Sequence, residues 1–195
     1  MLSYNESLKI LKETKALLDG HFILSSGLHS KQYVQCAKLL SYPEKAKAIC
    51  SSLVEKIKKE IGKIDLILSP AIGGIVVGYE VARQLKVNSI FAERIEGKLK
   101  LRRDFIIPHN LNVLIVEDVI TTGRSALECS VIVKSNRSNL AGYACIIDRS
   151  NKETLIKDKI VSQIKYKIET FDENQLPDEL RKIEAVSPGS KNLSK

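Results

Sequence analysis

The stretch Val113-Leu-Ile-Val-Glu-Asp-Val-Ile-Thr-Thr-Gly-Arg-Ser125 carries the most information about the fold of this chain. It opens with a short apolar run, and such a run predicts a buried strand. Two acids, Glu117 and Asp118, follow at the point where the strand emerges. A loop of hydroxyl residues and glycine then leads into a pattern that predicts a helix over residues 125–135. The stretch therefore predicts a strand, a polar turn and a helix in direct succession.

Similar apolar runs lie on both sides of this stretch, at residues 64–68, 89–92 and 141–147. Helical patterns lie among them, over residues 75–85 and 125–135. Runs that are apolar throughout and alternate with helices predict an α/β fold with a central, mostly parallel sheet covered on both faces. Ligands of such sheets bind beyond the carboxyl ends of the strands. We therefore expect a binding site at the polar turn.

At 195 residues, the chain fits a single domain. Residues 63–168 are expected to hold the core sheet, while residues 1–62 and the C-terminal tail add helices and a separate N-terminal hood. The patterns outside the core predict a helix over 4–18, extended pieces over 21–24 and 31–37, and a second helix from Pro43 through Ile61.

The composition is that of an ordinary globular protein, with 44% hydrophobic and 28% charged residues. No apolar run is long enough to span a bilayer, and the N-terminus lacks a signal-peptide pattern. The four cysteines have no metal-ligand spacing, which favours buried, reduced thiols in a cytoplasmic protein. The three histidines have no catalytic spacing, so surface or hood positions are expected for them.

The net charge of +8 has two interpretations. It fits a nucleic-acid or phosphate partner, and it equally fits lysines spread over solvated helix faces. Arginine is the more informative residue, because its planar fork suits phosphate and carboxylate groups. Five of the eight arginines fall in segments expected to line one site: Arg94, Arg102, Arg103, Arg124 and Arg149.

The polar turn has the chemistry of a sugar-phosphate site. Backbone amides that converge on a helix N-terminus bind anions, and Thr121, Thr122 and Ser125 add hydroxyl donors. The adjacent acids, Glu117 and Asp118, do not suit a phosphate, so they indicate sugar hydroxyls beside it or a magnesium shell. The spacing differs from that of a nucleotide P-loop, which requires a lysine before the Ser or Thr.

Residues 117–125 closely resemble the phosphoribosyl pyrophosphate (PRPP) signature of type I phosphoribosyltransferases. In that family the paired acids hold the ribose 2′ and 3′ hydroxyls, and the turn cradles the 5′-phosphate. Four further segments match the orotate branch of the family in order: the hood at 20–36, the pyrophosphate loop at 69–75, the mobile catalytic loop at 91–103, and the strand end at 147–150. Five ordered matches are much more specific than any one of them.

The resemblance implies an Mg²⁺-dependent pentosyltransferase of de novo pyrimidine (UMP) biosynthesis. It would transfer the 5-phosphoribosyl group of PRPP to orotate and release orotidine 5′-monophosphate and pyrophosphate. The Mg²⁺ is expected to be held mainly by PRPP and water, with no direct protein ligand. The family also implies a homodimer in which loop 94–103 reaches the neighbouring site, and it implies no nucleic-acid or membrane partner.

The resemblance also assigns roles to individual residues. Lys98 and Arg94 are expected to close over the diphosphate, and Asp118 is expected to stabilise positive charge on the ribose, so these three are the candidate catalytic residues. Thr121 and Arg149 are expected to bind orotate. The candidate PRPP-binding residues are Gly73, Gly74, Arg94, Lys98, Lys100, Glu117, Asp118, Val119, Ile120, Thr121, Thr122, Gly123, Arg124 and Ser125.

The chain departs from the family pattern at a few positions. Better-known members carry a lysine in the pyrophosphate loop, where this chain has Gly73, and another in the hood turn, where Ser25 stands. Lys98 and Lys100 are therefore expected to carry more of the diphosphate contact. Arg124 stands where a small residue is common, and its direction is left open.

Plainer alternatives remain open for several segments. Residues 73–74 also fit a helix-entry turn, and residues 94–103 also fit a solvated basic hairpin. Arg149 also fits a pairing with Asp148 or with a neighbouring helix. Two other functions fit the same signature. One is a phosphoribosyltransferase for another base, and the other is a non-catalytic regulator that senses PRPP and binds nucleic acid.

Overall fold

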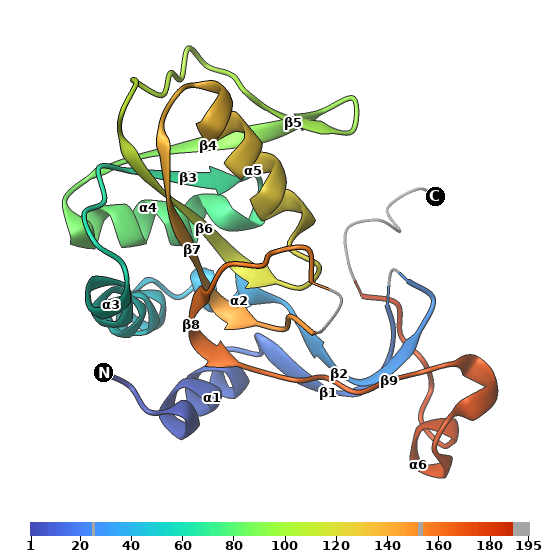
Figure 1. Ribbon diagram of the computed structural model, residues 1–195. Coiled ribbons are helices and arrows are strands. Elements are labelled where there is room, and N and C mark those ends of the chain that lie inside the picture. Colours follow the sequence, from blue (N-terminus) through green and yellow to red (C-terminus); the bar gives the residue numbers. More distant parts are fainter. Residues whose placement is uncertain (25, 152–153, 189–195) are drawn as a thin grey trace.

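The centre of the protein is a six-stranded sheet with the order β5-β4-β3-β6-β7-β8, seen in the computed structural model of Figure 1. The structure describes residues 1–24, 26–151 and 154–188. The strands are β3 (Leu66–Pro70), β4 (Asn88–Ile95), β5 (Lys98–Leu101), β6 (Asn112–Ile120), β7 (Asn139–Asp148) and β8 (Ile160–Lys165). All neighbours pair in parallel except β4 and β5, which form an antiparallel hairpin. The predicted mostly parallel sheet is therefore confirmed.

Helices cover both faces of this sheet, which explains why its strands are apolar along their length. The helices are α1 (Tyr4–Glu13), α2 (Cys36–Leu40), α3 (Pro43–Glu60), α4 (Gly73–Leu85), α5 (Arg124–Ser135) and α6 (Asp178–Arg181), with a 3-10 turn η1 (Glu173–Gln175). In β3, Ile67 packs into the cluster formed with α3 and α4. Its neighbours Leu66 and Leu68 pack into the opposite cluster, with α5. Because successive side chains point to opposite faces, no polar alternation appears in the sequence.

A three-stranded sheet forms a hood beyond the carboxyl ends of β6 and β7 (Figure 1). Its strands are β1 (Leu17–Ile23), β2 (His29–Val34) and β9 (Thr170–Phe171), and Val186 forms a bridge to Phe22 on β1. His21 and His29 are buried in the hood, with 2.6 Å between His21 Nε2 and His29 Nδ1. The hood therefore combines segments from both ends of the chain.

The helix expected over residues 4–18 is wrong at its C-terminal end. It stops at Glu13, and the chain turns at Lys15, whose φ is 55°. Ala16 O then accepts a hydrogen bond from Gln35 N, and Leu17 pairs with Val34. Sheet pairing in the hood therefore overrides the helical spacing of the leucines, as tertiary context commonly overrides local propensity.

The first sixty residues form part of the hood, as expected, but they are not separate from the core. Helix α3 contacts α4, β7 and β8 of the core. Its residues Ile49, Leu53 and Ile57 belong to the same buried cluster as the core strands. Elements α2, β8, β9, η1 and α6 were also not expected from the sequence. Among the described residues, no helix is both long and apolar enough to cross a membrane.

Candidate active site

The polar turn joins β6 to α5, as the sequence predicts. Strand β6 extends to Ile120, so Glu117 and Asp118 lie inside the strand, close to its carboxyl end. Gly123 has a φ of 76° and stands at the N-cap of α5 without a side chain to cap the helix, and Arg124 N makes only a long hydrogen bond of 3.5 Å to Thr122 Oγ1. The amides of the first turn are therefore available to an anion, and Ser125 lies within that turn.

A segment that sequence analysis did not identify supports this turn. Leu155 N donates a hydrogen bond to Thr122 O at 2.9 Å. A Cβ on Gly123 would lie only 2.6 Å from Ile156 Cγ1, so the position has no room for a side chain. The turn is thus enclosed by residues that follow it by about thirty positions along the chain, and no motif marks them.

Of the two acids on β6, Glu117 is buried and Asp118 is half-buried, and no positively charged side chain in the described part of the chain pairs with them. Glu117 is 7% exposed, and burial, followed by the Asp118 charge, raises its pKa to about 8. Burial also raises the pKa of Asp118, although Val119 N donates to Asp118 Oδ1 at 2.9 Å. No described Lys or Arg forms an ion pair with either carboxylate. Both groups therefore offer acceptors to hydroxyl donors of a ligand.

The start of α4 lies directly beside Asp118. A Cβ on Gly73 would meet the two carboxylate oxygens of Asp118 at 2.8 and 2.9 Å, and a Cβ on Gly74 would meet Val116 O at 3.0 Å. The two glycines therefore allow the helix start to approach the end of β6 closely. A lysine in place of Gly73, as in better-known family members, would require Asp118 to move. The second departure, Ser25, lies outside the described residues.

Arg149 follows β7, and no described Asp or Glu forms an ion pair with it. Its backbone N donates to Ile120 O at 2.8 Å, and its side-chain Nε is buried with no hydrogen-bond partner among the described residues. Burial lowers the pKa of its guanidinium below the usual value. Asp148 instead accepts from Ser150 N at 2.8 Å and lies 3.8 Å from Lys165 Nζ. The alternative pairing of Arg149 with Asp148 is therefore wrong.

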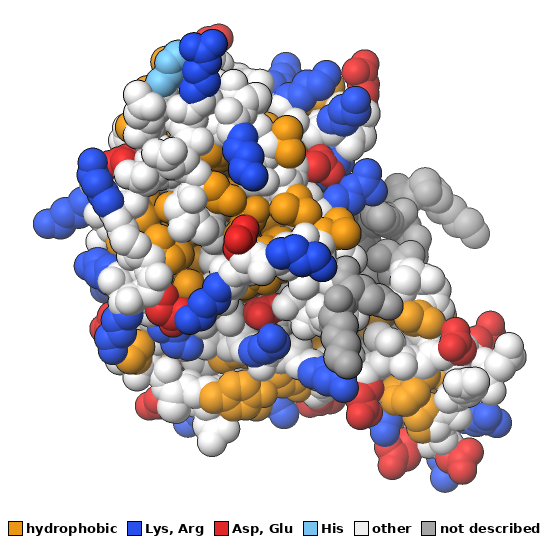
Figure 2. All heavy atoms as spheres, in the orientation of Figure 1, with side chains coloured by type: hydrophobic (Ala, Val, Ile, Leu, Met, Phe, Trp, Pro, Cys, Tyr) orange, Lys and Arg blue, Asp and Glu red, His pale blue; other side chains and the backbone are white. Residues whose placement is uncertain are grey.

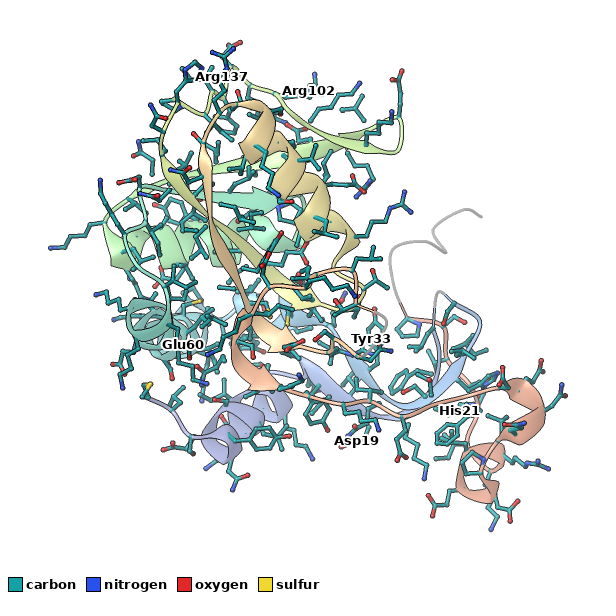
Figure 3. All side chains as sticks on the ribbon, in the orientation of Figure 1. Asp19, His21, Tyr33, Glu60, Arg102 and Arg137 are labelled. Atoms are coloured by element: carbon teal, nitrogen blue, oxygen red, sulfur yellow. The ribbon has the colours of Figure 1, made fainter. Side chains whose placement is uncertain are left out.

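A cleft of about 860 Å³ separates the strand ends from the hood. Thr121, Thr122 and Arg149 line its core side, and Tyr166 and Phe171 are among the residues that line the rest. In Figure 3, Tyr33 of β2 lies where the hood faces the core. The hood residues Ser26 and Leu28 belong to the segment 20–36 that matched the family, whereas the lining residues 165–171 were not identified from the sequence, because they carry no motif.

The basic hairpin of β4 and β5 does not line this cleft. Arg94 Nη1 lies 3.0 Å from a carboxylate oxygen of Glu128 on α5, and Lys100 pairs with Glu96 at 3.7 Å. Lys98 is exposed. Arg102, at the base of the hairpin, is far from Tyr33 in Figure 3. Within one chain, the structure does not bring Lys98 or Lys100 to Arg149.

A contact within α5 sets the orientation of the Arg124 side chain. Its Nε lies 3.3 Å from Glu128 Oε1, one turn further along α5. Arg124 thus lies along the helix instead of pointing into the turn. On the face in Figure 2, Lys and Arg side chains are scattered among acids, with no single basic patch. This distribution resembles that of a solvated surface more than that of a nucleic-acid footprint.

The possible metal ligands are few. In the ranges that the structure describes, no three His, Cys, Asp or Glu residues gather to hold an ion. Glu117 and Asp118 nevertheless supply oxygen acceptors without a cation, and hard cations such as Mg²⁺ prefer oxygen. These residues fit an Mg²⁺ held mainly by a bound diphosphate and water, with the acids nearby.

Comparison with known proteins agrees with this geometry. Residues 39–176 match the model of the phosphoribosyl transferase domain. Orotate phosphoribosyltransferase of Caldicellulosiruptor bescii is 45% identical over 94% of this chain and 96% of its own length.

Two solved structures share the fold. The crystal structure of orotate phosphoribosyltransferase from Aeropyrum pernix matches with a TM-score of 0.70 and 24% identity, covering 80% of this chain and 92% of that chain. Adenine phosphoribosyltransferase from Thermoanaerobacter pseudethanolicus matches with a TM-score of 0.60 and 18% identity, covering 69% and 88%. Enzymes for different bases thus share this fold, and it is the sequence identity over the whole length that separates them. The chain belongs to the phosphoribosyltransferase family, in its orotate phosphoribosyltransferase branch.

Proposed function

We propose that this protein transfers the 5-phosphoribosyl group of PRPP to orotate, giving orotidine 5′-monophosphate and pyrophosphate. The observation that carries the choice of base is Arg149, whose buried Nε has no partner among the described residues and whose side chain lines the cleft. A half-buried guanidinium whose Nε has no partner among the described residues favours a ligand that brings a carboxylate. Orotate has a carboxylate, whereas uracil, adenine and hypoxanthine do not.

The proposed reaction needs no nucleophilic side chain. Orotate reacts after its N1 proton has been lost to solvent. A bond forms between the anionic N1 and ribose C1 while the bond from C1 to the diphosphate oxygen breaks, and pyrophosphate leaves with the electron pair. Glu117 and Asp118 accept hydrogen bonds from the ribose hydroxyls, and Asp118 stabilises positive charge that develops on the sugar. Amides of residues 121–125 hold the 5′-phosphate, and Thr121 with Arg149 orients orotate. Catalysis then depends on positioning and electrostatics.

Mg²⁺ is proposed to bind together with the diphosphate of PRPP. When bound there, Mg²⁺ neutralises negative charge on the leaving pyrophosphate. The acids on β6 lie close to α4, where Gly73 and Gly74 leave the backbone open to a diphosphate. The contribution of the chain is to orient the ribose beneath that group and to exclude water from C1.

The functional unit is proposed to be a homodimer. Lys98 is exposed and lies outside the cleft of its own chain, which supports a role for the hairpin 94–103 in the site of a neighbouring copy. Each copy is proposed to be one phosphoribosyltransferase domain. The four cysteines are buried and unpaired, which supports a reducing, cytoplasmic setting.

The decisive assay follows loss of orotate absorbance with PRPP and Mg²⁺ present. Uracil, adenine and hypoxanthine are offered in parallel under the same conditions. Turnover of orotate alone supports the proposal, and turnover of a purine would assign the protein to another base. Salt-dependent nucleic-acid binding without turnover would favour a regulator instead.

A further inference from the structure

One carboxylate on α5, that of Glu128, holds the basic hairpin from both sides of its tip. Glu128 Oε2 lies 3.0 Å from Arg94 Nη1 and accepts a hydrogen bond from the backbone N of Leu99 at 3.1 Å. Its Oε1 also accepts from Arg124 Nε at 3.3 Å. The acid thus connects α5 to both strands of the hairpin and to the first residue of its own helix.

These contacts bracket Lys98. Arg94 and Leu99 are partners across the hairpin, and Arg94 Nη1 also donates to Gly97 O at 2.6 Å. Lys98 stands between Gly97 and Leu99, so the residues on both sides of it are tied to Glu128, one directly and one through Arg94. Lys98 itself is exposed. The backbone that carries Lys98 is therefore held while its side chain stays available.

Packing reinforces the same attachment. The Leu99 side chain is only 7% exposed and belongs to the buried cluster that contains Ala126 and Cys129 of α5. Arg94 Nη2 lies 3.4 Å from Ser125 Oγ, in the first turn of the helix that follows the phosphate loop. The hairpin and the candidate phosphate site are therefore linked through one helix.

We infer that Glu128 is a positioning residue, which sets the place of Lys98 for phosphoribosyl transfer by fixing both flanks of the hairpin tip to α5. The inference rests on the proposed function, and it adds a residue to which neither composition nor motif pointed. It holds whether Lys98 acts in its own chain or in a neighbouring copy, because the attachment lies within one chain.

Glu128 remains charged in this setting. Burial opposes the charge, but the hydrogen bonds from Arg94 and from the Leu99 amide more than compensate, and the pKa of Glu128 is lowered. The side chains of Arg94 and Glu128 are 39% and 24% exposed, so the ion pair should add little to global stability. Its effect is expected in geometry instead.

The test is a double-mutant cycle measured with orotate, PRPP and Mg²⁺. Glu128→Ala should lower kcat by about 10- to 100-fold, the loss expected when a reacting group is displaced by about 1 Å. Glu128→Gln keeps an oxygen for the Leu99 amide but loses the charge, so its kcat should lie between those of wild type and Glu128→Ala. In a Lys98→Ala background, Glu128→Ala should have little further effect, because the group that it positions is already absent. Equal losses in both backgrounds would overturn the inference.

Glu80 on α4 provides a matched control. Its carboxylate accepts hydrogen bonds from Arg83 Nε and Nη2, each at 2.8 Å, and among the described residues its hydrogen bonds all stay within α4. Glu80→Ala should leave kcat unchanged.

Hydrogen exchange gives a readout that does not depend on turnover. Amides of residues 96–101 should exchange faster in Glu128→Ala than in wild type or Glu80→Ala. Unchanged exchange together with unchanged kcat in Glu128→Ala would refute the role of Glu128. A wild-type protein without orotate turnover would instead refute the proposed function, whatever the exchange shows.

Discussion

The buried carboxyl group of Glu117 should make the ligand-free protein less stable as pH rises. Its pKa is raised from 4.5 to about 8, so between these values the folded protein keeps a proton that the unfolded chain has lost. The free energy of unfolding therefore falls as pH rises through this window, and the full penalty is present above it. A pKa difference of this size corresponds to a penalty of up to about 5 kcal/mol.

Glu117→Gln removes the charge and keeps the shape of the side chain. At about pH 5 the free energy of unfolding of the variant should be close to that of wild type. By about pH 9 it should exceed that of wild type by several kcal/mol. Urea denaturation of both proteins across this range measures the difference. Glu44→Gln is the control, because the Glu44 side chain is 87% exposed and pairs only loosely with Lys47 at 3.7 Å. It should change stability little at any pH.

The same substitution should weaken the response to PRPP. Glutamine cannot accept two ribose hydrogen bonds as a carboxylate does, so PRPP with Mg²⁺ should raise the Tm of the variant less than that of wild type. The reasoning fails if the stability difference between Glu117→Gln and wild type is the same at every pH. It also fails if PRPP stabilises both proteins equally.

Three further substitutions test the rest of the site. Lys98→Ala should lower kcat by roughly two orders of magnitude, as expected for the loss of one preorganised electrostatic group; near-normal turnover would remove Lys98 from the mechanism. Arg149→Ala should raise the KM for orotate by about 100-fold, because a charged hydrogen-bond partner of the carboxylate is lost, with a smaller effect on the KM for PRPP. Equal orotate affinity in calorimetry would refute that role. Gly123→Ala should cost about 1–3 kcal/mol of unfolding free energy and weaken PRPP binding, because φ is positive there and Ile156 leaves no room for a Cβ; an unchanged urea midpoint would show that the turn adapts.

Several features could be predicted from local sequence. The apolar residues 66–68 and 113–116 are buried on both faces, so each run is recognisable as a core strand without knowledge of its neighbours. The acids, hydroxyl residues and glycine of 117–125 lie on one short connection, and a strand–turn–helix connection keeps them together in any such fold. The side-chain chemistry of residues 117–125 could therefore be predicted before the fold was known.

Other features depend on contacts between distant segments. Leucine spacing extended the predicted first helix to residue 18, but pairing of Leu17 with Val34 placed that end in the hood. Among the described residues, Asp148 lies near Lys165 on the next strand and Arg149 Nε has no partner, and no local pattern reveals either fact.

The sequence by itself thus determined the alternation of the core strands β3, β4, β6 and β7 with helices α4 and α5, and the polar turn with its paired acids, because these depend on side chains a few positions apart. Only the tertiary structure decided how hood and core enclose the cleft and how Glu128 contacts the hairpin. It also decided that no described Lys or Arg pairs with Glu117 or Asp118. The physical reason is that such features require groups far apart along the chain to meet, and their meeting depends on the packing of the whole molecule.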